Sequence, residues 1–181
     1  MSYSNYCKCQ NTYTPKQTNT IKYLAQYAKQ VVKHELKKHK DQRNCAVFDI
    51  DETVIQSTCM ICKEDLKDPK IIKPMYNLVH LLFKNGVDIY FVTARSDTPG
   101  ARKYTVNQLK EFNLDVYKKL YMKGMKQPED KDIGIIKKEA RQDITENGYN
   151  IILSVGDQET DMEGGFFKES IKMPNSVYEV R

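Results

Sequence analysis

The 181-residue sequence contains no apolar run that approaches the roughly 20 residues of a membrane-spanning helix, so no membrane partner is expected. Its N-terminal residues are polar and lack the apolar core of a signal peptide, which predicts a protein that stays in the cytoplasm. Internal repeats and low-complexity tracts are also absent. The composition, 40% hydrophobic and 29% charged, is that of a soluble globular protein. We expect one domain over residues 16–181, preceded by a flexible arm over residues 1–15.

The five cysteines are an odd number, and a reducing compartment is the simpler interpretation of this count. Cys59 and Cys62 form a CxxC pattern and Cys7 and Cys9 a CxC pattern, so a four-thiolate zinc site is conceivable. No second CxxC and no nearby histidine supports such a site. Free thiols in a loop and in the N-terminal arm are the favoured interpretation.

Acidic residues are scarce from Lys16 to Arg43. This segment contains eight lysines or arginines and two acidic residues, Glu35 and Asp41. Such a basic face could attract phosphate-rich or nucleic-acid ligands. A charge run is more often the solvated side of a helix, however, and this is the favoured interpretation here. Nucleic acid is therefore the less favoured partner.

The apolar pattern alternates between buried strands and amphipathic helices. This alternation implies right-handed crossovers and a parallel sheet. We therefore expect an α/β fold, a Rossmann-like three-layer sandwich whose central parallel sheet has about five strands. The expected helices are 16–39, 72–86, 99–112 and 132–146, the expected strands are 45–50, 87–93, 118–122, 150–155 and 170–173, and residues 53–72 are expected to be a loop or flap.

Room for a lid can be judged by counting residues. About twenty residues separate Thr53 from the helix near Lys73, and fourteen separate Met122 from Lys137. Neither gap can hold a separate cap domain. The sequence thus predicts an open crevice, unless a second subunit of a homodimer covers it.

Polar side chains follow several of the predicted strands, at the edge of the sheet where α/β proteins bind ligands. Two carboxylates at the tip of a buried strand are costly to fold unless a cation partners them. The candidates are Asp49 and Asp51 after the first strand, Thr93 after the second, Asp157 and Asp161 after the fourth, and Lys137 or Lys138 near the start of the preceding helix.

These residue types suit phosphoryl transfer. Asp49 would attack the phosphorus in line and form an aspartyl-phosphate intermediate, and Asp51 would protonate the leaving oxygen and then activate water. Thr93 and one of the two lysines would neutralise and position the phosphoryl oxygens.

A magnesium site is predicted beside the nucleophile, because Mg²⁺ prefers oxygen ligands in near-octahedral geometry. Asp49 and Asp157 can supply carboxylates, and the backbone carbonyl of Asp51 a third ligand. Asp161 would hold a metal-bound water or orient Asp157.

With these residues in order, the chain resembles the haloacid dehalogenase (HAD) superfamily of phosphohydrolases. The stretches FDIDET, FVTARSD, IKKEAR and GDQETD, followed by IKMPNSVY, resemble its subfamily IIIB acid phosphatases, which include plant acid phosphatases and vegetative storage proteins. The similarity runs from about residue 20 to the C-terminus. It favours Lys137 over Lys138, because the family's lysine lies four residues before an arginine, here Arg141. Periodicity alone leaves both open.

The leading hypothesis is a Mg²⁺-dependent phosphomonoesterase that acts on small phosphate esters or nucleotides. One alternative is a phosphatase for nucleic-acid ends or phosphoproteins, and another is a storage or binding protein without turnover. Arg95, near Thr93, could steer a substrate phosphate or form an ordinary surface salt bridge, and the sequence favours neither.

Overall fold

The structure is a computed structural model that describes residues 13–58, 65–124 and 132–174. Its strands are β1 (Arg43–Phe48), β2 (Ile55–Thr58), β3 (Asp65–Ile71), β4 (Asp88–Asp97), β5 (Tyr117–Gly124), β6 (Tyr149–Gly156) and β7 (Glu169–Lys172). Its helices are α1 (Pro15–Lys38), α2 (Lys73–Lys84), α3 (Pro99–Glu111), α4 (Ile133–Glu146) and the short 3₁₀ helix η1 (Glu159–Asp161).

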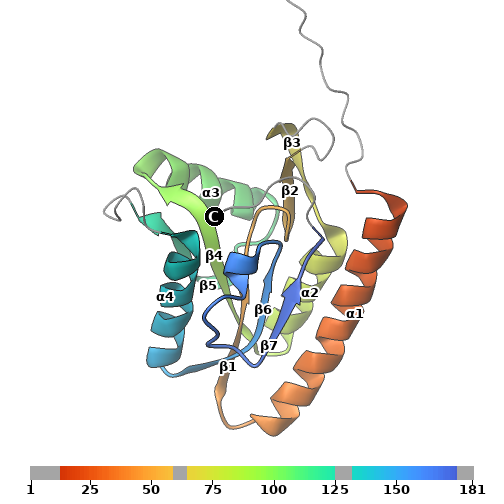
Figure 1. The fold of residues 1–181 in the computed structure, drawn as a ribbon, viewed down its shortest axis with the longest axis vertical. Helices are drawn as coiled ribbons and strands as arrows, with labels where there is room; N and C mark the ends of the chain where they lie inside the picture. Colours follow the sequence, from red (N-terminus) through yellow and green to blue (C-terminus); the bar gives the residue numbers. More distant parts are fainter. Residues whose placement is uncertain (1–12, 59–64, 125–131, 175–181) are drawn as a thin grey trace, which may run out of the picture.

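Five strands form one parallel sheet in the order β5-β4-β1-β6-β7. From β1 the chain moves outward to β4 and β5, and then returns to β6 and β7 on the other side of β1 (Figure 1). In a sheet of this kind the reversal of direction opens a crevice at the carboxyl end of the central strand. The predicted α/β fold with about five parallel strands is confirmed.

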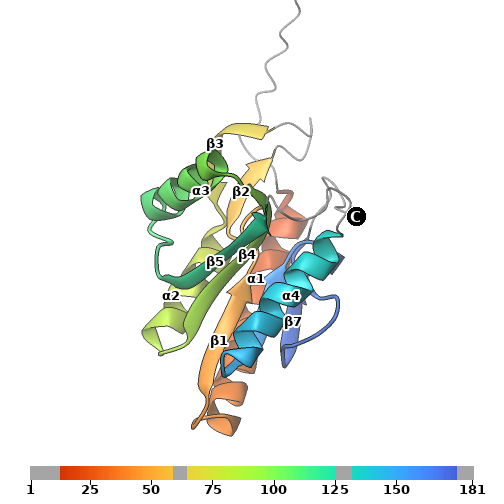
Figure 2. The same ribbon diagram turned by 90° about the vertical axis from the view of Figure 1, so that its left-hand side faces the viewer.

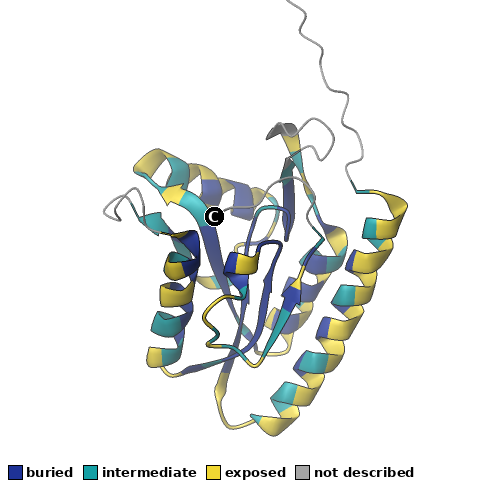
Figure 3. Ribbon diagram, in the orientation of Figure 1, coloured by how far each residue is buried: buried dark blue, intermediate teal, exposed yellow. Residues whose placement is uncertain are grey.

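The two faces of the sheet are covered unequally. Successive strand residues point to opposite faces, so Phe48 joins the core formed with α1, α2 and α3, whereas Val47 joins the core formed with α4. Figure 2 shows α2 and α3 on one side of the sheet and α4 on the other. Figure 3 shows that the strands and the inward faces of the helices are buried. These are the three layers that the sequence predicts.

Local sequence determines where the helices begin. Thr14 caps α1, since its hydroxyl accepts a hydrogen bond from the Gln17 backbone while the Gln17 side chain binds back to Thr14. Asp132 caps α4 by accepting a bond of 2.6 Å from the Gly134 N–H. The second cap fixes the first turn of α4.

The predicted loop at 53–72 is wrong in part, because β2 and β3 pair there as an antiparallel hairpin with Ile55 opposite Ile71. The hairpin stands above the carboxyl ends of the parallel strands (Figure 1). The segment contains lysine, aspartate and Pro69 and lacks an alternating apolar pattern. This composition favours a loop over a strand, which explains the wrong prediction. The strand predicted at 87–93 also continues further, because β4 runs to Asp97.

Several predictions fall outside the described residues. The zinc hypothesis for Cys7, Cys9, Cys59 and Cys62 lies there, as does nearly all of the arm predicted at 1–15. The single domain over 16–181, the homodimer and the cytoplasmic location stay predictions. Within the described ranges, no helix combines the length and the apolar character needed to cross a membrane.

Candidate active site

Strand register brings three of the predicted site residues to one edge of the sheet. Phe48 pairs with Phe91 of β4 and with Val155 of β6. Asp49, Thr93 and Asp157 follow these positions by one or two residues. The Asp49 N–H donates to the Val155 carbonyl over 2.9 Å, which fixes the backbone of Asp49 at the carboxyl end of β1.

Three carboxylates crowd together at this edge. Asp49, Asp157 and Asp161 are 5%, 3% and 4% exposed, and each offers an oxygen within 4.8 Å of the others. Burial raises the pKa of Asp49 well above its ordinary value despite nearby Lys137, and the neighbouring carboxylates raise it further. Burial also raises the pKa of Asp157 to about 6. The three groups are therefore short of positive charge.

Lys137 supplies one positive charge to this cluster from the second turn of α4. Its Nζ lies 3.1 Å from Asp49 Oδ1 and 2.6 Å from Asp161 Oδ1, and the side chain is 2% exposed. Burial alone would lower the pKa of Lys137, but the two carboxylates raise it above its ordinary value. Lys138 is exposed and does not share this position. Three buried carboxylates whose oxygens lie this close together form a donor set that fits a divalent cation with oxygen ligands.

Asp161 is held by the turn that contains η1. Its Oδ2 accepts a bond of 3.1 Å from the Gln158 N–H, and the Ser154 hydroxyl donates to its carbonyl over 3.0 Å. A Cβ atom added at Gly156 would lie 2.1 Å from Asp161 Cγ, so only glycine fits there. The glycine at the end of β6 thus lets Asp161 fold back toward Lys137.

Arg141 is a positioning residue, a role that its place four residues after Lys137 in the sequence does not reveal. It lies one turn after Lys137 on α4 and is 1% exposed. Its guanidinium donates to the carbonyls of Asp161 and Gly165 over 3.0 Å each, and to that of Glu163. Burial lowers the pKa of Arg141. The side chain therefore ties the turn that carries Asp161 to the helix that carries Lys137.

Asp51 has a partner that the sequence did not reveal. Arg95, in the part of β4 beyond Thr93, binds both carboxylate oxygens of Asp51 over 2.7 Å each. A third bond joins Arg95 Nη1 to the Thr105 hydroxyl of α3 over 3.3 Å. The hydrogen bonds and charge of Asp51 raise the pKa of Arg95, although burial opposes this rise. Arg95 is thus in an ion pair, and its partner lies in the crevice rather than on the outer surface.

The chain turns sharply after Asp51. Glu52 is fully buried in the left-handed region, with φ of 53°, and its carboxylate accepts bonds from the Ser57 N–H at 3.0 Å and the Tyr13 hydroxyl at 3.2 Å. The Ile55 N–H donates back to the Ile50 carbonyl over 3.0 Å. This turn directs the chain into the hairpin and holds the backbone of Asp51 in place.

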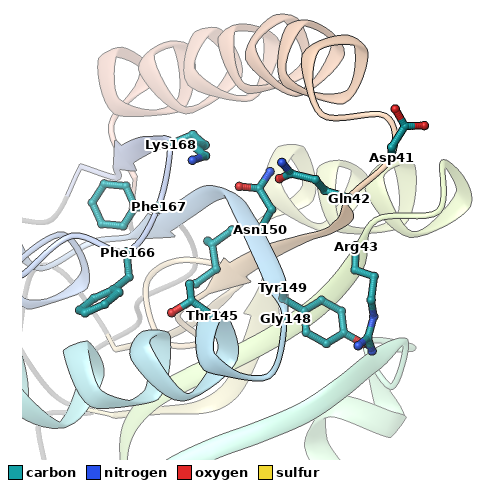
Figure 4. A pocket seen from close by; sticks show the side chains of 11 residues that line it. Asp41, Gln42, Arg43, Thr145, Gly148, Tyr149, Asn150, Phe166, Phe167 and Lys168 are labelled. Atoms are coloured by element: carbon teal, nitrogen blue, oxygen red, sulfur yellow. The ribbon is translucent and has the colours of Figure 1, made fainter.

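A pocket of about 640 Å³ lies at the opposite end of the sheet, around the amino ends of β1, β6 and β7 (Figure 4). Its Arg43 guanidinium stacks over the Tyr149 ring at 4.0 Å from the ring centre. None of the predicted site residues lines it, so the pocket is separate from the carboxylate cluster. The lining residues are Asp41, Gln42, Arg43, Thr145, Gly148, Tyr149, Asn150, Ile151, Phe166, Phe167 and Lys168.

Comparison with known proteins gives a consistent result. Residues 60–181 match the family model described as HAD superfamily, subfamily IIIB (acid phosphatase). This range includes Thr93, Lys137, Asp157 and Asp161 and begins after Asp49 and Asp51. Among solved structures, the Class C acid phosphatase from Bacillus anthracis is similar with a TM-score of 0.71 at 15% identity, over 92% of this chain and 81% of that one.

Two curated plant proteins are also similar. The stem 28 kDa glycoprotein of Glycine max is 32% identical over 115 residues, which is 62% of this chain and 43% of the relative. Acid phosphatase 1 of Solanum lycopersicum is 26% identical over 155 residues, which is 76% of this chain and 60% of the relative. The chain thus spans less than two thirds of the length of these relatives.

Proposed function

Because the chain belongs to subfamily IIIB of the HAD superfamily, the acid phosphatases, we propose that it hydrolyses phosphomonoesters with Mg²⁺ through an aspartyl-phosphate on Asp49. The observation that carries this proposal is the position of Asp49. Its buried carboxylate lies 3.1 Å from Lys137 Nζ and within 4.8 Å of oxygens of Asp157 and Asp161. A carboxylate so placed can meet an anionic phosphate only where positive charge surrounds both.

The first step is attack of an Asp49 oxygen on phosphorus, which forms the acyl-phosphate bond and breaks the bond to the leaving oxygen. Asp51 gives its proton to that oxygen, and in the second step it takes a proton from the water that hydrolyses the acyl-phosphate. In the structure both carboxylate oxygens of Asp51 accept hydrogen bonds from Arg95, so neither is free to face the leaving oxygen. We therefore assign Arg95 a second partner, the phosphoryl oxygens of the substrate, whose arrival releases Asp51.

Lys137 and Thr93 bind the phosphoryl group in this scheme. Lys137 is buried and charged, so it can neutralise a phosphoryl oxygen without moving far from Asp49. Thr93, within β4, is 2% exposed, and its hydroxyl accepts a hydrogen bond from the backbone N–H of Arg95 over 3.3 Å. Electrostatic positioning of this kind supplies most of what the phosphoryl-transfer transition state requires.

The proposed Mg²⁺ ligands are the carboxylates of Asp49 and Asp157 and the backbone carbonyl of Asp51, with Asp161 in support. The bound ion would offset the repulsion between the Asp49 carboxylate and the phosphate. The Asp161 carboxylate already accepts hydrogen bonds from Lys137 Nζ and from the Gln158 N–H. It is therefore suited to support the metal site rather than to bind the ion directly. The proposed substrates are small phosphomonoesters, nucleotides included.

The first test is hydrolysis of an aryl phosphate by the purified protein, with and without Mg²⁺, beside an Asp49→Asn variant. We expect Mg²⁺-dependent turnover that falls by at least about 1,000-fold in the variant, as for loss of other nucleophiles. Asp88→Asn, at the far end of β4 and paired with Lys118, is the matched control and should keep full turnover. Turnover that survives in Asp49→Asn would remove Asp49 as the nucleophile.

The alternatives lead to different results in the same assay. A storage or binding protein would show no turnover at any pH or metal concentration, although the complete set of Asp49, Asp51, Lys137 and Asp157 weighs against this. A phosphatase for nucleic-acid ends would lose activity on an oligonucleotide as salt rises while keeping its activity on a small ester.

A further inference from the structure

Helices α1 and α2 lie side by side on one face of the sheet (Figure 1) and leave a groove of about 720 Å³ between their C-terminal halves. The floor of this groove is aliphatic, formed by Val32 and Leu36 of α1 and by Leu81 and Leu82 of α2. Leu81 is 39% exposed, although its neighbour Leu82 is buried. The groove is therefore an apolar surface left open to solvent.

Four lysines form one rim of the groove: Lys29, Lys33 and Lys37 of α1, and Lys40 just beyond its C-terminal end. The spacing of four residues places the three helical lysines in a single stripe along α1, and Lys40 extends this stripe. All four are exposed, and none forms an ion pair with a described residue. The acid of α1, Glu35, contacts His34 and His39 instead. Like charges at this spacing destabilise a helix, so the stripe is a charge pattern without an internal partner.

A second hollow of about 670 Å³ continues from Lys29 toward the hairpin. It adds Lys22 of α1 and Lys73 at the start of α2, both exposed, to the basic lining. The groove thus runs along much of α1 with positive charge throughout. It is lined by neither Asp49 nor any other residue of the proposed active site.

We propose that the groove between α1 and α2 binds an acidic amphipathic helix of a partner protein. Such a helix would lay its apolar residues on Val32, Leu36 and Leu81 and direct its carboxylates to the lysine stripe, as in other helix-in-groove complexes. The helical part of the stripe, from Lys29 to Lys37, spans about 12 Å, which corresponds to about two turns of a docked helix. This inference does not depend on the proposed phosphatase activity.

Charge and shape select this occupant over others. A second copy of the chain, with net charge +5 and the same stripe, would be repelled. Single-stranded nucleic acid needs aromatic faces on which bases stack, and the groove floor is aliphatic. A membrane surface needs a projecting apolar face, whereas here the apolar residues lie between two helices.

The test is titration of the whole protein with a labelled model peptide of about 14 residues, with leucines at helical spacing and glutamates beside them. We expect saturable binding that is at least about tenfold weaker in Lys33→Glu/Lys37→Glu and in Leu81→Ser. Lys103→Glu/Lys110→Glu, which makes the same charge change at exposed positions of α3, is the control and should bind as the native protein does. A scrambled peptide of the same composition should bind at least about tenfold more weakly.

Equal affinity for the scrambled peptide, or equal affinity of the groove variants, would overturn the proposal, as would no saturable binding below about 1 mM. Binding of phosphatidylserine vesicles or of single-stranded DNA that needs Lys33 and Lys37, without peptide binding, would assign the groove to another partner and also overturn it. Circular dichroism should show the native fold in every variant. Aryl phosphate turnover should be unchanged, because the groove holds none of the proposed active-site residues.

Discussion

At the scale of single residues, the site is set by an imbalance of charge. Asp49, Asp157 and Asp161 are buried together, and among the described residues Lys137 forms ion pairs with Asp49 and Asp161. A protein can satisfy such a cluster with a proton or with a cation. The raised pKa values of Asp49 and Asp157 show that the protein without a metal ion favours the proton.

This preference gives a pH-dependent stability. The pKa of Asp157 is raised from 3.8 to about 6, so its stabilising contribution is fully present below about pH 4 and is lost as pH rises through about 6. Bound Mg²⁺ would replace the lost proton. We expect Mg²⁺ to raise Tm more at pH 7.5 than at pH 5, measured by calorimetry.

The variant Asp157→Asn isolates this effect. It should have a higher Tm than the native protein at pH 7.5 without metal, because a neutral amide carries no charge to bury. The Mg²⁺-induced rise in Tm should disappear. A variant that keeps the full rise would show that Asp157 is not a ligand.

Arg95 offers a second prediction at this scale. Arg95→Gln removes the charged, two-pronged donor that the proposed mechanism moves from Asp51 to the phosphoryl oxygens, so we expect kcat for an aryl phosphate to fall about 100-fold. Arg95→Lys should restore only part of the loss, because an ammonium group cannot bind both oxygens in the same way. Steady-state kinetics measures both.

Arg102→Gln is the matched control for Arg95. Arg102 also pairs with an aspartate, Asp97, but that pair lies at the more exposed end of β4 and touches no site residue. Its loss should leave kcat unchanged. A fall in kcat as large as that of Arg95→Gln would mean that loss of any ion pair in this region lowers turnover.

The individual residues differ in how far sequence could predict them. Asp49 and Asp157 could be placed because each follows a buried apolar strand, and parallel strands share one carboxyl edge. The choice between Lys137 and Lys138 could not be made from periodicity, since adjacent helix residues both lie near the start of α4. The Asp51–Arg95 pair joins residues 44 positions apart, and only the packing of β4 beside β1 brings them together.

At the scale of elements, α4 organises half of the site. Lys137 and Arg141 project from one face of the helix, one turn apart, toward Asp161. Arg141 reaches three carbonyls in the segment from Asp161 to Gly165. The helix therefore sets the position of the lysine and of the turn that follows β6.

Arg141→Met should loosen this turn. Three carbonyls, one buried and two partly buried, would lose their donor, and we expect a loss of about 3 kcal/mol in the free energy of unfolding, with Tm lower by about 6–12 °C. The Mg²⁺ concentration for half-maximal turnover should also rise in Arg141→Met. In Arg141→Lys this concentration should lie between those of Arg141→Met and the native protein. Thermal melts and Mg²⁺ titrations measure these changes.

Gln142→Met serves as the control, since Gln142 binds Glu146 on the exposed side of the same helix. Equal losses in the two variants would show that α4 responds to any change of side chain. Elements themselves were largely predictable, because strands β1, β4 and β6 each contain a short apolar run that is buried in the sheet. The β2–β3 hairpin was not predictable, because β3 is rich in charged residues and, in the described part of the chain, β2 is its pairing partner.

At the scale of the whole molecule, the predicted open crevice bears on which substrates can reach the site. In the described ranges only the β2–β3 hairpin stands above the carboxyl ends of the strands (Figure 1). Substrate recognition would then rest on the phosphoryl group and much less on the rest of the ester.

This openness predicts tolerance of bulky substrates. We expect kcat/KM for a phosphotyrosine peptide to lie within about tenfold of that for an aryl phosphate, because no lid excludes the peptide. Steady-state assays of the two substrates, with and without Mg²⁺, measure the ratio. A peptide hydrolysed about 1,000-fold more slowly would indicate a closed site.

The contact between Lys137 and Asp49 joins residues 88 positions apart in the chain. A nascent chain that leaves the ribosome exposes Asp49 long before α4 has been synthesised. The turn that carries Asp161 comes later still, after β6. Closing loops of this length is slow compared with local helix formation. The proposed hydrolysis would therefore need the chain at least as far as Asp161, and a fragment that ends before α4 should be inactive.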